Sequence, residues 1–365
     1  MRGFRAHIRS GRLGSRSAAV AGTISAPPRT GTRRQEAQDK ERAMSATVGV
    51  AIQAFDAHDF VTQVRQAEMS GVPVAWTTIG GASGADPLTV FAAALTATER
   101  IRLGTAIVPT WPRHPVVIAQ QAQALEQLAP GRLRLGIGPS HEPTMVRNFG
   151  VHWEAPLTQL REYLTVIRTL TTAGSVDFEG KHVTARATFR NPRAVELLAS
   201  ALRPRSFETC GELADGAISW MCPASYLVRE ALPAIERGSD RVGRPAPPLI
   251  AHVPVMVSED REAVRALARR QLGNYGSVPF YLAMFHAAGF PDAGSGYSDA
   301  MLDDLIVSGT EEQVAARFAQ MIDDGCGEIL AHPLLDPADR EGSIERAFHA
   351  VAVAHQRVSR GLPVQ

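Results

Sequence analysis

The chain has 365 residues, of which 45% are hydrophobic and 21% are charged, and its formal net charge at pH 7 is +1. This composition is typical of a soluble globular protein and excludes a disordered chain, a fibre and a small disulfide-rich scaffold. Charged or strongly polar residues interrupt every apolar stretch well before about 18 residues, so we expect no membrane span and no membrane partner.

The first 43 residues differ in charge from the rest of the chain. Residues 1–43 contain ten basic and three acidic side chains, whereas the remainder contains 28 basic and 34 acidic ones. A basic, Arg- and Ser-rich start is compatible with a transit peptide, with a nucleic-acid arm, or with a natural start at Met44. Because patterned sequence begins only at Thr47, we expect a basic, disordered extension over residues 1–43 and one domain over residues 44–365.

From Met44 onward, short apolar runs alternate with amphipathic stretches, and eight such pairs follow one another. The runs are typical of strands, which we predict at Val48–Ile52, Val74–Thr78, Ile101–Val108, Arg132–Gly138, Ala194–Ala199, Gly216–Trp220, Leu249–Val257 and Glu328–His332. The helices that follow are predicted at Asp56–Ser70, Asp86–Thr98, His114–Leu128, Pro156–Thr172, Arg205–Leu213, Ala224–Arg237, Glu259–Leu272 and Ser343–Arg357, with Asp56 and Ser343 as caps. Eight strand–helix units in one domain favour a closed parallel (β/α)8 TIM barrel over an open sheet.

Two segments interrupt this repeat. Val176–Val183 predicts a hairpin that turns at Glu179-Gly180, inserted after strand four. Residues 273–309 follow strand seven and are rich in glycine, proline and aromatic residues. Long insertions in a compact domain are often lids, interfaces or binding loops, so this segment is predicted to be a substrate lid or a dimer contact.

In a barrel of this kind, chemistry is expected at the carboxyl ends of the strands. Gly138-Pro139-Ser140 after strand four forms a tight turn that a phosphate can approach closely. It lacks the third glycine of a dinucleotide-binding motif and does not complete a nucleophile elbow. A second turn with small residues and arginines follows strand five, at Ser200, Ala201, Leu202, Arg203, Arg205 and Ser206. One phosphodiester or pyrophosphate-like tail could span both turns, while the alternative is a tight βα turn followed by a solvated loop.

Other functional classes have little support. The eleven histidines show no HxxxH or HExxH spacing, so no metal site is expected. His114 follows strand three and is predicted either to line a pocket or to cap the next helix. The three cysteines form no CxxC pair and cannot all be bridged, which indicates a reducing compartment and a cytoplasmic protein.

Several ordered landmarks carry a family resemblance. They are Thr98–Ala106, Arg113–Pro115, Gly131–Gly138, Arg161–Leu164, Val176–Gly180, Gly211–Gly216 and Ser308–Val314. In this order and spacing, the chain from Thr47 to its C-terminus resembles the luciferase-like monooxygenase family. The resemblance implies a TIM barrel that binds reduced flavin or the 5-deazaflavin coenzyme F420, and it implies a homodimer.

The resemblance also assigns roles to residues. It places a strand-three bulge, often a non-prolyl cis peptide behind the cofactor ring, at Ala106-Ile107. Pro139 and Ser140 correspond to cofactor contacts, and the phosphate end corresponds to Ser200, Ala201, Leu202, Arg203, Arg205 and Ser206. Ile79-Gly80 stands where the sugar-phosphate dehydrogenase branch has an Asp-His pair, which argues against glucose-6-phosphate dehydrogenation.

These expectations combine into one hypothesis about function. The protein is predicted to be an F420-dependent oxidoreductase that transfers a hydride between the deazaflavin and a small organic substrate. His141 is the candidate proton donor, while Gln53, Trp76, His114 and Trp220 are candidate pocket walls with a structural role equally open. The alternatives are a two-component monooxygenase that uses reduced FMN and oxygen, and a non-catalytic flavin-binding barrel. No nucleic-acid partner is expected.

Overall fold

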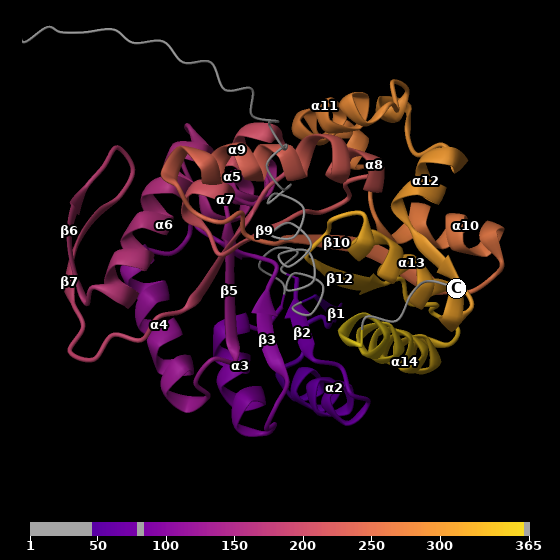
Figure 1. Ribbon diagram of the computed structural model, residues 1–365, viewed down its shortest axis with the longest axis horizontal. Coiled ribbons are helices and arrows are strands. Elements are labelled where there is room, and N and C mark those ends of the chain that lie inside the picture. The colour runs from indigo at the N-terminus through magenta and orange to yellow at the C-terminus, as the bar shows by residue number, and fades with distance from the viewer. Residues whose placement is uncertain (1–45, 79–83, 361–365) are drawn as a thin grey trace, which may run out of the picture. The chain divides into compact units, whose positions relative to one another are not determined.

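The computed structural model describes residues 46–78 and 84–360 (Figure 1). The predicted extension over residues 1–43 and the Ile79-Gly80 pair lie outside the described residues.

Eight parallel strands form a closed barrel in the described part of the chain. They are β1 (Thr47–Ala51), β2 (Val74–Thr77), β3 (Arg102–Thr105), β5 (Leu133–Gly138), β8 (Glu196–Ser200), β9 (Gly216–Ile218), β10 (Leu249–Val257) and β12 (Glu328–Pro333). Each strand pairs with the next in this order, β9 pairs with β10, and β12 returns to β1. The predicted TIM barrel is therefore confirmed.

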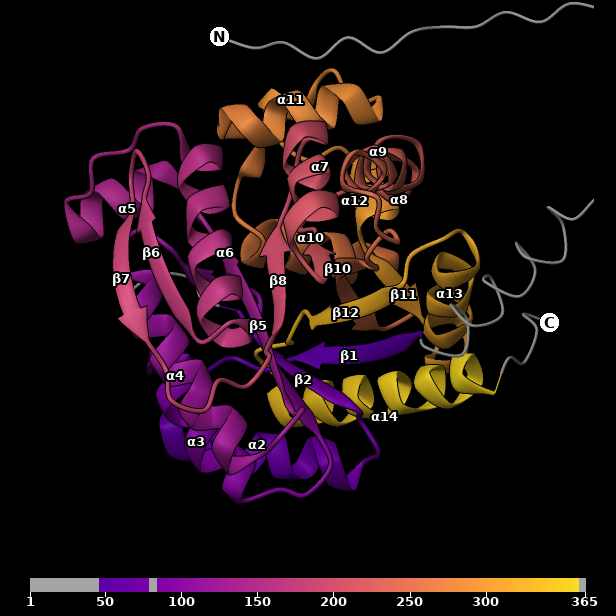
Figure 2. The same ribbon diagram turned by 60° about the vertical axis from the view of Figure 1, so that its left-hand side comes forward.

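Helices surround the barrel and bury their apolar faces against it (Figures 1 and 2). The main ones are α2 (Ala57–Met69), α3 (Pro87–Thr96), α4 (Pro115–Leu128), α6 (Pro156–Thr172), α7 (Pro204–Leu213), α9 (Leu232–Val242), α10 (Arg261–Gln271), α13 (Glu311–Asp323) and α14 (Arg340–Ser359). Asp56 caps α2 as predicted, since its carboxylate accepts a hydrogen bond from the Asp59 amide. The predicted cap Ser343 is wrong: α14 begins three residues earlier, and Asp339 caps it by accepting from the Gly342 amide.

Both predicted insertions form distinct substructures. The hairpin consists of β6 (Ser175–Glu179) and β7 (Thr184–Thr188), which pair in antiparallel fashion and stand beside the barrel (Figure 1). The segment after α10 contains α11 (Pro279–Ala288) and α12 (Asp299–Leu305), and it ends in β11 (Val307–Gly309), which pairs with the end of β10. Figure 2 shows α11 beyond the ends of β8 and α7, on the carboxyl side of the barrel.

Side chains at alternate strand positions fill the barrel interior. Trp76 occupies its centre with no exposed surface. A Cβ atom built on Gly104 would lie 2.3 Å from the Trp76 ring, so the absence of a side chain at Gly104 makes room for the indole. The Arg134 guanidinium lies 4.7 Å from the centroid of the Trp76 ring and donates hydrogen bonds to Glu196 and Glu328 near the amino ends of their strands. This ion cluster, in which Arg134 and Glu328 are buried, closes the amino-terminal end of the barrel.

Candidate functional site at the carboxyl end of the barrel

The strand-three bulge has the predicted form. The peptide bond between Ala106 and Ile107 is cis. Strand pairing resumes immediately after it, because β4 (Val108–Pro109) pairs in parallel with the end of β5. Ala106 and Ile107 are half-buried and pack against the apolar cluster inside the barrel. The bulge therefore forms a shelf at the carboxyl end of the barrel core.

The turns after β5 and β8 meet this shelf. A Cβ atom on Gly138 would lie 2.1 Å from the Ser200 hydroxyl oxygen and 3.2 Å from Ile107 Cγ1. Glycine at this position thus allows three strand ends to approach one another. Ser140, two residues further on, has a left-handed backbone with a φ of 63°. Such non-glycine residues carry conformational strain and are frequent at functional sites.

The Ser200–Ser206 turn is not the open set of backbone amides that the sequence suggested. The amides of Leu202 and Arg203 both donate to the Ser206 hydroxyl, and that hydroxyl donates to the Arg203 carbonyl. The Ala201 amide donates to Ile218 on the next strand. Ser206 therefore closes the start of α7, and these amides are already satisfied within the protein. Side chains, rather than these amides, are the groups at this turn that could hold an anion.

The polar side chains of these two turns have unused hydrogen-bonding capacity. Arg203 and Arg205 are exposed, and neither forms an ion pair with a described residue. The hydroxyls of Ser140 and Ser200 are half-buried and likewise have no hydrogen-bond partner among the described residues. Two guanidiniums and two hydroxyls thus remain available to a ligand.

His141 lies directly after the strained Ser140 and is covered by the insertion. Its Nε2 is 3.4 Å from the Tyr281 hydroxyl, and its ring contacts the rings of Tyr275 and Tyr281 edge-on. Burial lowers the pKa of His141 below its usual value and raises the pKa of Tyr281 well above its own. The imidazole and the phenol are therefore both neutral at pH 7.

A cluster of three rings lies on the other side of the barrel mouth. Trp220 packs on His252 of β10 and on His332 of β12, with ring centroids 4.1 and 5.0 Å apart. His252 Nε2 lies 3.2 Å from His332 Nδ1. Burial lowers the pKa of His332 to about 4, and burial together with the neighbouring His332 lowers the pKa of His252 well below its usual value. Both imidazoles are therefore neutral at pH 7 and share one hydrogen bond.

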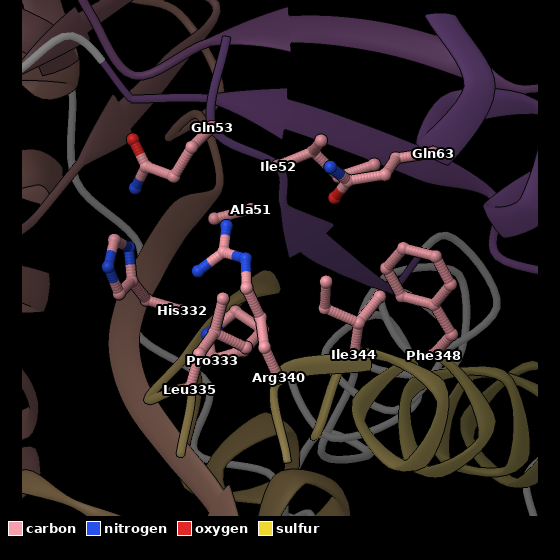
Figure 3. Close-up of a pocket in the computed structure, with 10 residues that line it drawn as sticks. All are labelled: Ala51, Ile52, Gln53, Gln63, His332, Pro333, Leu335, Arg340, Ile344 and Phe348. Carbon is pink, nitrogen blue, oxygen red and sulfur yellow. The ribbon is translucent and has the colours of Figure 1, made fainter. Parts of the chain in front are cut away.

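A small cleft opens beside this ring cluster (Figure 3). It lies between the ends of β1 and β12 and the first turns of α14, and it is lined by Gln53, His332 and Arg340 together with the apolar side chains of Leu335, Ile344 and Phe348. The Gln53 amide nitrogen donates to the Thr78 hydroxyl at 2.9 Å, which fixes the orientation of this side chain.

The four predicted pocket residues occupy different environments. Gln53 and Trp220 lie at the carboxyl end of the barrel, in the cleft and in the ring cluster respectively. Trp76 does not line a pocket, since it fills the barrel core and is completely buried. His114 is exposed and caps α4, because its Nδ1 accepts from the Val116 amide while its Nε2 contacts the Thr184 carbonyl of the hairpin. The pocket role predicted for these last two is therefore not supported.

Five residues of the site were not singled out in the sequence: Tyr275, Tyr281, His252, His332 and Arg340. His332 ends a predicted strand, so its position at the barrel mouth could have been inferred from the rule applied to the other strands. The two tyrosines belong to the predicted lid, but which lid residues face inward depends on how that segment folds. Arg340 lies in the first turn of a helix that was predicted to start later.

Comparisons with known proteins agree with this architecture. A family model described as luciferase-like monooxygenase matches residues 22–327. The chain is 26% identical over 310 residues to a 5,10-methylenetetrahydromethanopterin reductase of Archaeoglobus fulgidus, covering 77% of this chain and 91% of the relative. It is 29% identical over 285 residues to an F420-dependent glucose-6-phosphate dehydrogenase of Beutenbergia cavernae, covering 74% and 83%.

A solved structure shares the fold at lower identity. An F420-dependent secondary alcohol dehydrogenase, in complex with an F420–acetone adduct, superimposes with a TM-score of 0.72 at 19% identity and covers 85% of this chain and 99% of that one. In the described part of the chain, no helix is both long enough and apolar enough to cross a bilayer. With more than half of its length matched by the family model, the chain belongs to the luciferase-like monooxygenase family and is an oxidoreductase of that family.

Proposed function

We propose that this protein binds the 5-deazaflavin coenzyme F420 and transfers a hydride between it and a small organic substrate. The observation that carries the proposal is the set of unused donors beside the cis bulge, which consists of the Ser140 and Ser200 hydroxyls and the Arg203 and Arg205 guanidiniums. The similarity to an F420-dependent relative at 29% identity supports the choice of cofactor.

The residues at the barrel mouth fit a planar ring with an anionic tail. Ala106 and Ile107 offer a half-buried apolar shelf for the ring. The two hydroxyls and the two guanidiniums supply hydrogen bonds and positive charge for a phosphodiester, and charge-assisted contacts of this kind are the strong ones. Because the amides of Leu202 and Arg203 are already bonded to Ser206, the arginine side chains would hold the phosphate end.

A bound deazaflavin would supply the hydride acceptor or donor, which leaves proton transfer and positioning to the protein. The neutral imidazole of His141 would accept the proton of a substrate hydroxyl during alcohol oxidation and would return it in the reverse direction. Tyr281 orients that imidazole, and Tyr275 and Tyr281 together cover it from solvent. The insertion that carries both tyrosines would thereby act as the lid over the reacting groups.

Equilibrium titrations test this proposal directly. Purified protein is titrated separately with F420 and with FMN, and ligand fluorescence is followed in each case. We expect tight binding of F420 and negligible binding of FMN. Tighter binding of FMN would instead favour the two-component monooxygenase, and absence of binding of both ligands would favour a non-catalytic barrel.

A further inference from the structure

We propose that the cleft between the ends of β1 and β12 binds an oxyanionic group of the substrate through Arg340, so that the substrate is an organic acid or a phosphate ester. This inference rests on the proposed function, because it names the substrate class of the same site. It concerns the opposite side of the barrel mouth from the arginines assigned to the cofactor.

The first argument is the unpaired charge of Arg340. Its side chain forms no ion pair or hydrogen bond with any described residue. Figure 3 shows its guanidinium directed between Ala51 and His332 and toward Gln53. The acidic residues near it in sequence do not neutralise it: Asp339 pairs with Arg346 and caps α14, and neither Asp336 nor Glu341 forms an ion pair with Arg340.

The second argument is the chemistry of the surrounding walls. The Gln53 amide nitrogen uses one of its two hydrogens on Thr78, and Figure 3 shows this nitrogen on the side of the cleft. Leu335, Ile344 and Phe348 line the same cleft with apolar side chains. Arg340 is exposed as a residue, but these apolar side chains shield an oxyanion inside the cleft from part of the surrounding water, so its ion pair with Arg340 is less screened than one on an open surface.

The third argument is the hydrogen-bonding state of His332. Its Nδ1 faces His252, so its Nε2 remains for a ligand. In a neutral imidazole, one nitrogen donates and the other accepts. If His252 donates to Nδ1, Nε2 of His332 carries a proton and becomes a second donor to the oxyanion. The proposal therefore requires this tautomer.

The size and place of the cleft define what part of a substrate it holds. Its volume is about 20 Å³, which accommodates one small polar group rather than a whole molecule. From the cleft, His332 contacts Trp220, Trp220 contacts Tyr275, and Tyr275 contacts His141. This chain of ring contacts runs from the cleft to the proposed proton acceptor, and the proposal requires a substrate long enough to place its anionic group in the cleft and its reacting carbon beside His141.

The test measures oxyanion binding in a protein from which the other proposed oxyanion site has been weakened. In an Arg205→Gln background, calorimetric titrations with sodium phosphate and sodium acetate are carried out at constant ionic strength. Adding Arg340→Gln is expected to weaken binding of at least one probe by about ten- to hundredfold, the usual effect of one charge-assisted bond. Adding Arg317→Gln, an exposed arginine on α13, removes the same charge and is expected to change neither affinity.

The relative strength of the two probes identifies the source of the oxyanion, since tighter acetate indicates a carboxylic acid and tighter phosphate a phosphate ester. Unchanged affinity for both probes after Arg340→Gln would overturn the inference.

Single-variant Arg340→Gln protein should also retain the F420 affinity of the wild type. Weaker F420 binding in this variant would assign the cleft to the cofactor and overturn the substrate subsite, whereas failure of the wild type to bind F420 would count against the proposed function alone.

Discussion

Arg134 and Arg205 lie at opposite ends of the same barrel and differ in their surroundings. Arg134 is buried at the amino-terminal end, where Glu328 and Glu196 accept its hydrogen bonds at 2.5 and 2.7 Å. Arg205 is exposed at the carboxyl-terminal end and has no partner among the described residues. The ion cluster around Arg134 contributes to the stability of the fold, whereas Arg205 remains available for binding a ligand. This division agrees with the general placement of active sites in such barrels.

The largest expected effect on stability comes from removing the ion pairs of Arg134 at the amino-terminal end. Replacing Arg134 with methionine leaves Glu328 buried without its main partner, and breaking one side of a buried ion pair typically costs about 3–5 kcal/mol. We therefore expect Arg134→Met to lower the free energy of unfolding by about that amount in denaturant titrations. Arg205→Met is the matched variant at the other end and should change it by less than about 0.5 kcal/mol. If both variants lost the same free energy of unfolding, Arg134 would contribute no more to stability than Arg205, which would contradict the prediction.

The next effect concerns His332 at the carboxyl end, a half-buried histidine beside the buried His252. The pKa of His332 is about 4 in the folded protein and about 6.5 in an unfolded chain, so the unfolded chain binds the proton first as pH falls. Stability should therefore decrease between about pH 6.5 and pH 4, by about 3 kcal/mol for this residue. Denaturant titrations across this range should show a shallower pH dependence for His332→Gln than for the wild type. His152→Gln is the control, because that imidazole is exposed, and a slope that is the same in all three proteins would refute the assignment.

The fold could be predicted from the sequence because periodicity reports which residues are buried. All eight strands and the hairpin were found in this way, although the predicted strand Gly216–Trp220 ends at Ile218. The cis bulge at Ala106-Ile107 was predicted from the family resemblance rather than from periodicity.

The candidate site was harder to predict from the sequence because its contacts join residues that are far apart along the chain. His252 and His332 are 80 positions apart, and nothing in their separate strands indicates that they share a hydrogen bond. The turn after β8 shows a different limit of sequence reasoning. Its composition matches a phosphate-binding loop, but the Ser206 hydroxyl consumes the amides that such a loop would present. Hydrogen bonds internal to a turn are not visible in its composition.

A smaller effect is expected at the proposed phosphate site, where Arg205 is exposed. Replacing Arg205 with alanine removes one charge-assisted contact, worth about 1.5–3 kcal/mol or about ten- to hundredfold in affinity. Fluorescence titration should show this loss for F420 but almost no loss for the deazaflavin compound that lacks the phosphate tail. Ala106→Val is the contrasting variant, since it crowds the ring shelf and should weaken both ligands. Equal weakening of both ligands by Arg205→Ala would mean that this turn is merely structural.

The smallest effect tests whether backbone strain at the carboxyl end serves binding. Ser140 and Ala155 both have left-handed backbones, with φ values of 63° and 43°, but only Ser140 lies beside the ring shelf. Glycine adopts this conformation without the steric cost of about 1–2 kcal/mol, although it loses about 0.5–1 kcal/mol of conformational entropy on folding. Ser140→Gly and Ala155→Gly should therefore each raise the free energy of unfolding by up to about 1 kcal/mol.

Ser140→Gly and Ala155→Gly should differ in their affinity for F420. Ser140→Gly also removes a hydroxyl that has no partner within the described chain, so F420 binding should weaken by somewhat less than tenfold, as expected for one neutral hydrogen bond. Ala155→Gly removes no polar group and should leave F420 affinity unchanged. A Ser140 variant that is more stable but binds less tightly would show that the strained serine is maintained for its hydroxyl. If Ser140→Gly gained stability without losing affinity, the hydroxyl would have no part in holding the cofactor, and Arg203, Arg205 and Ser200 would have to hold the tail without it.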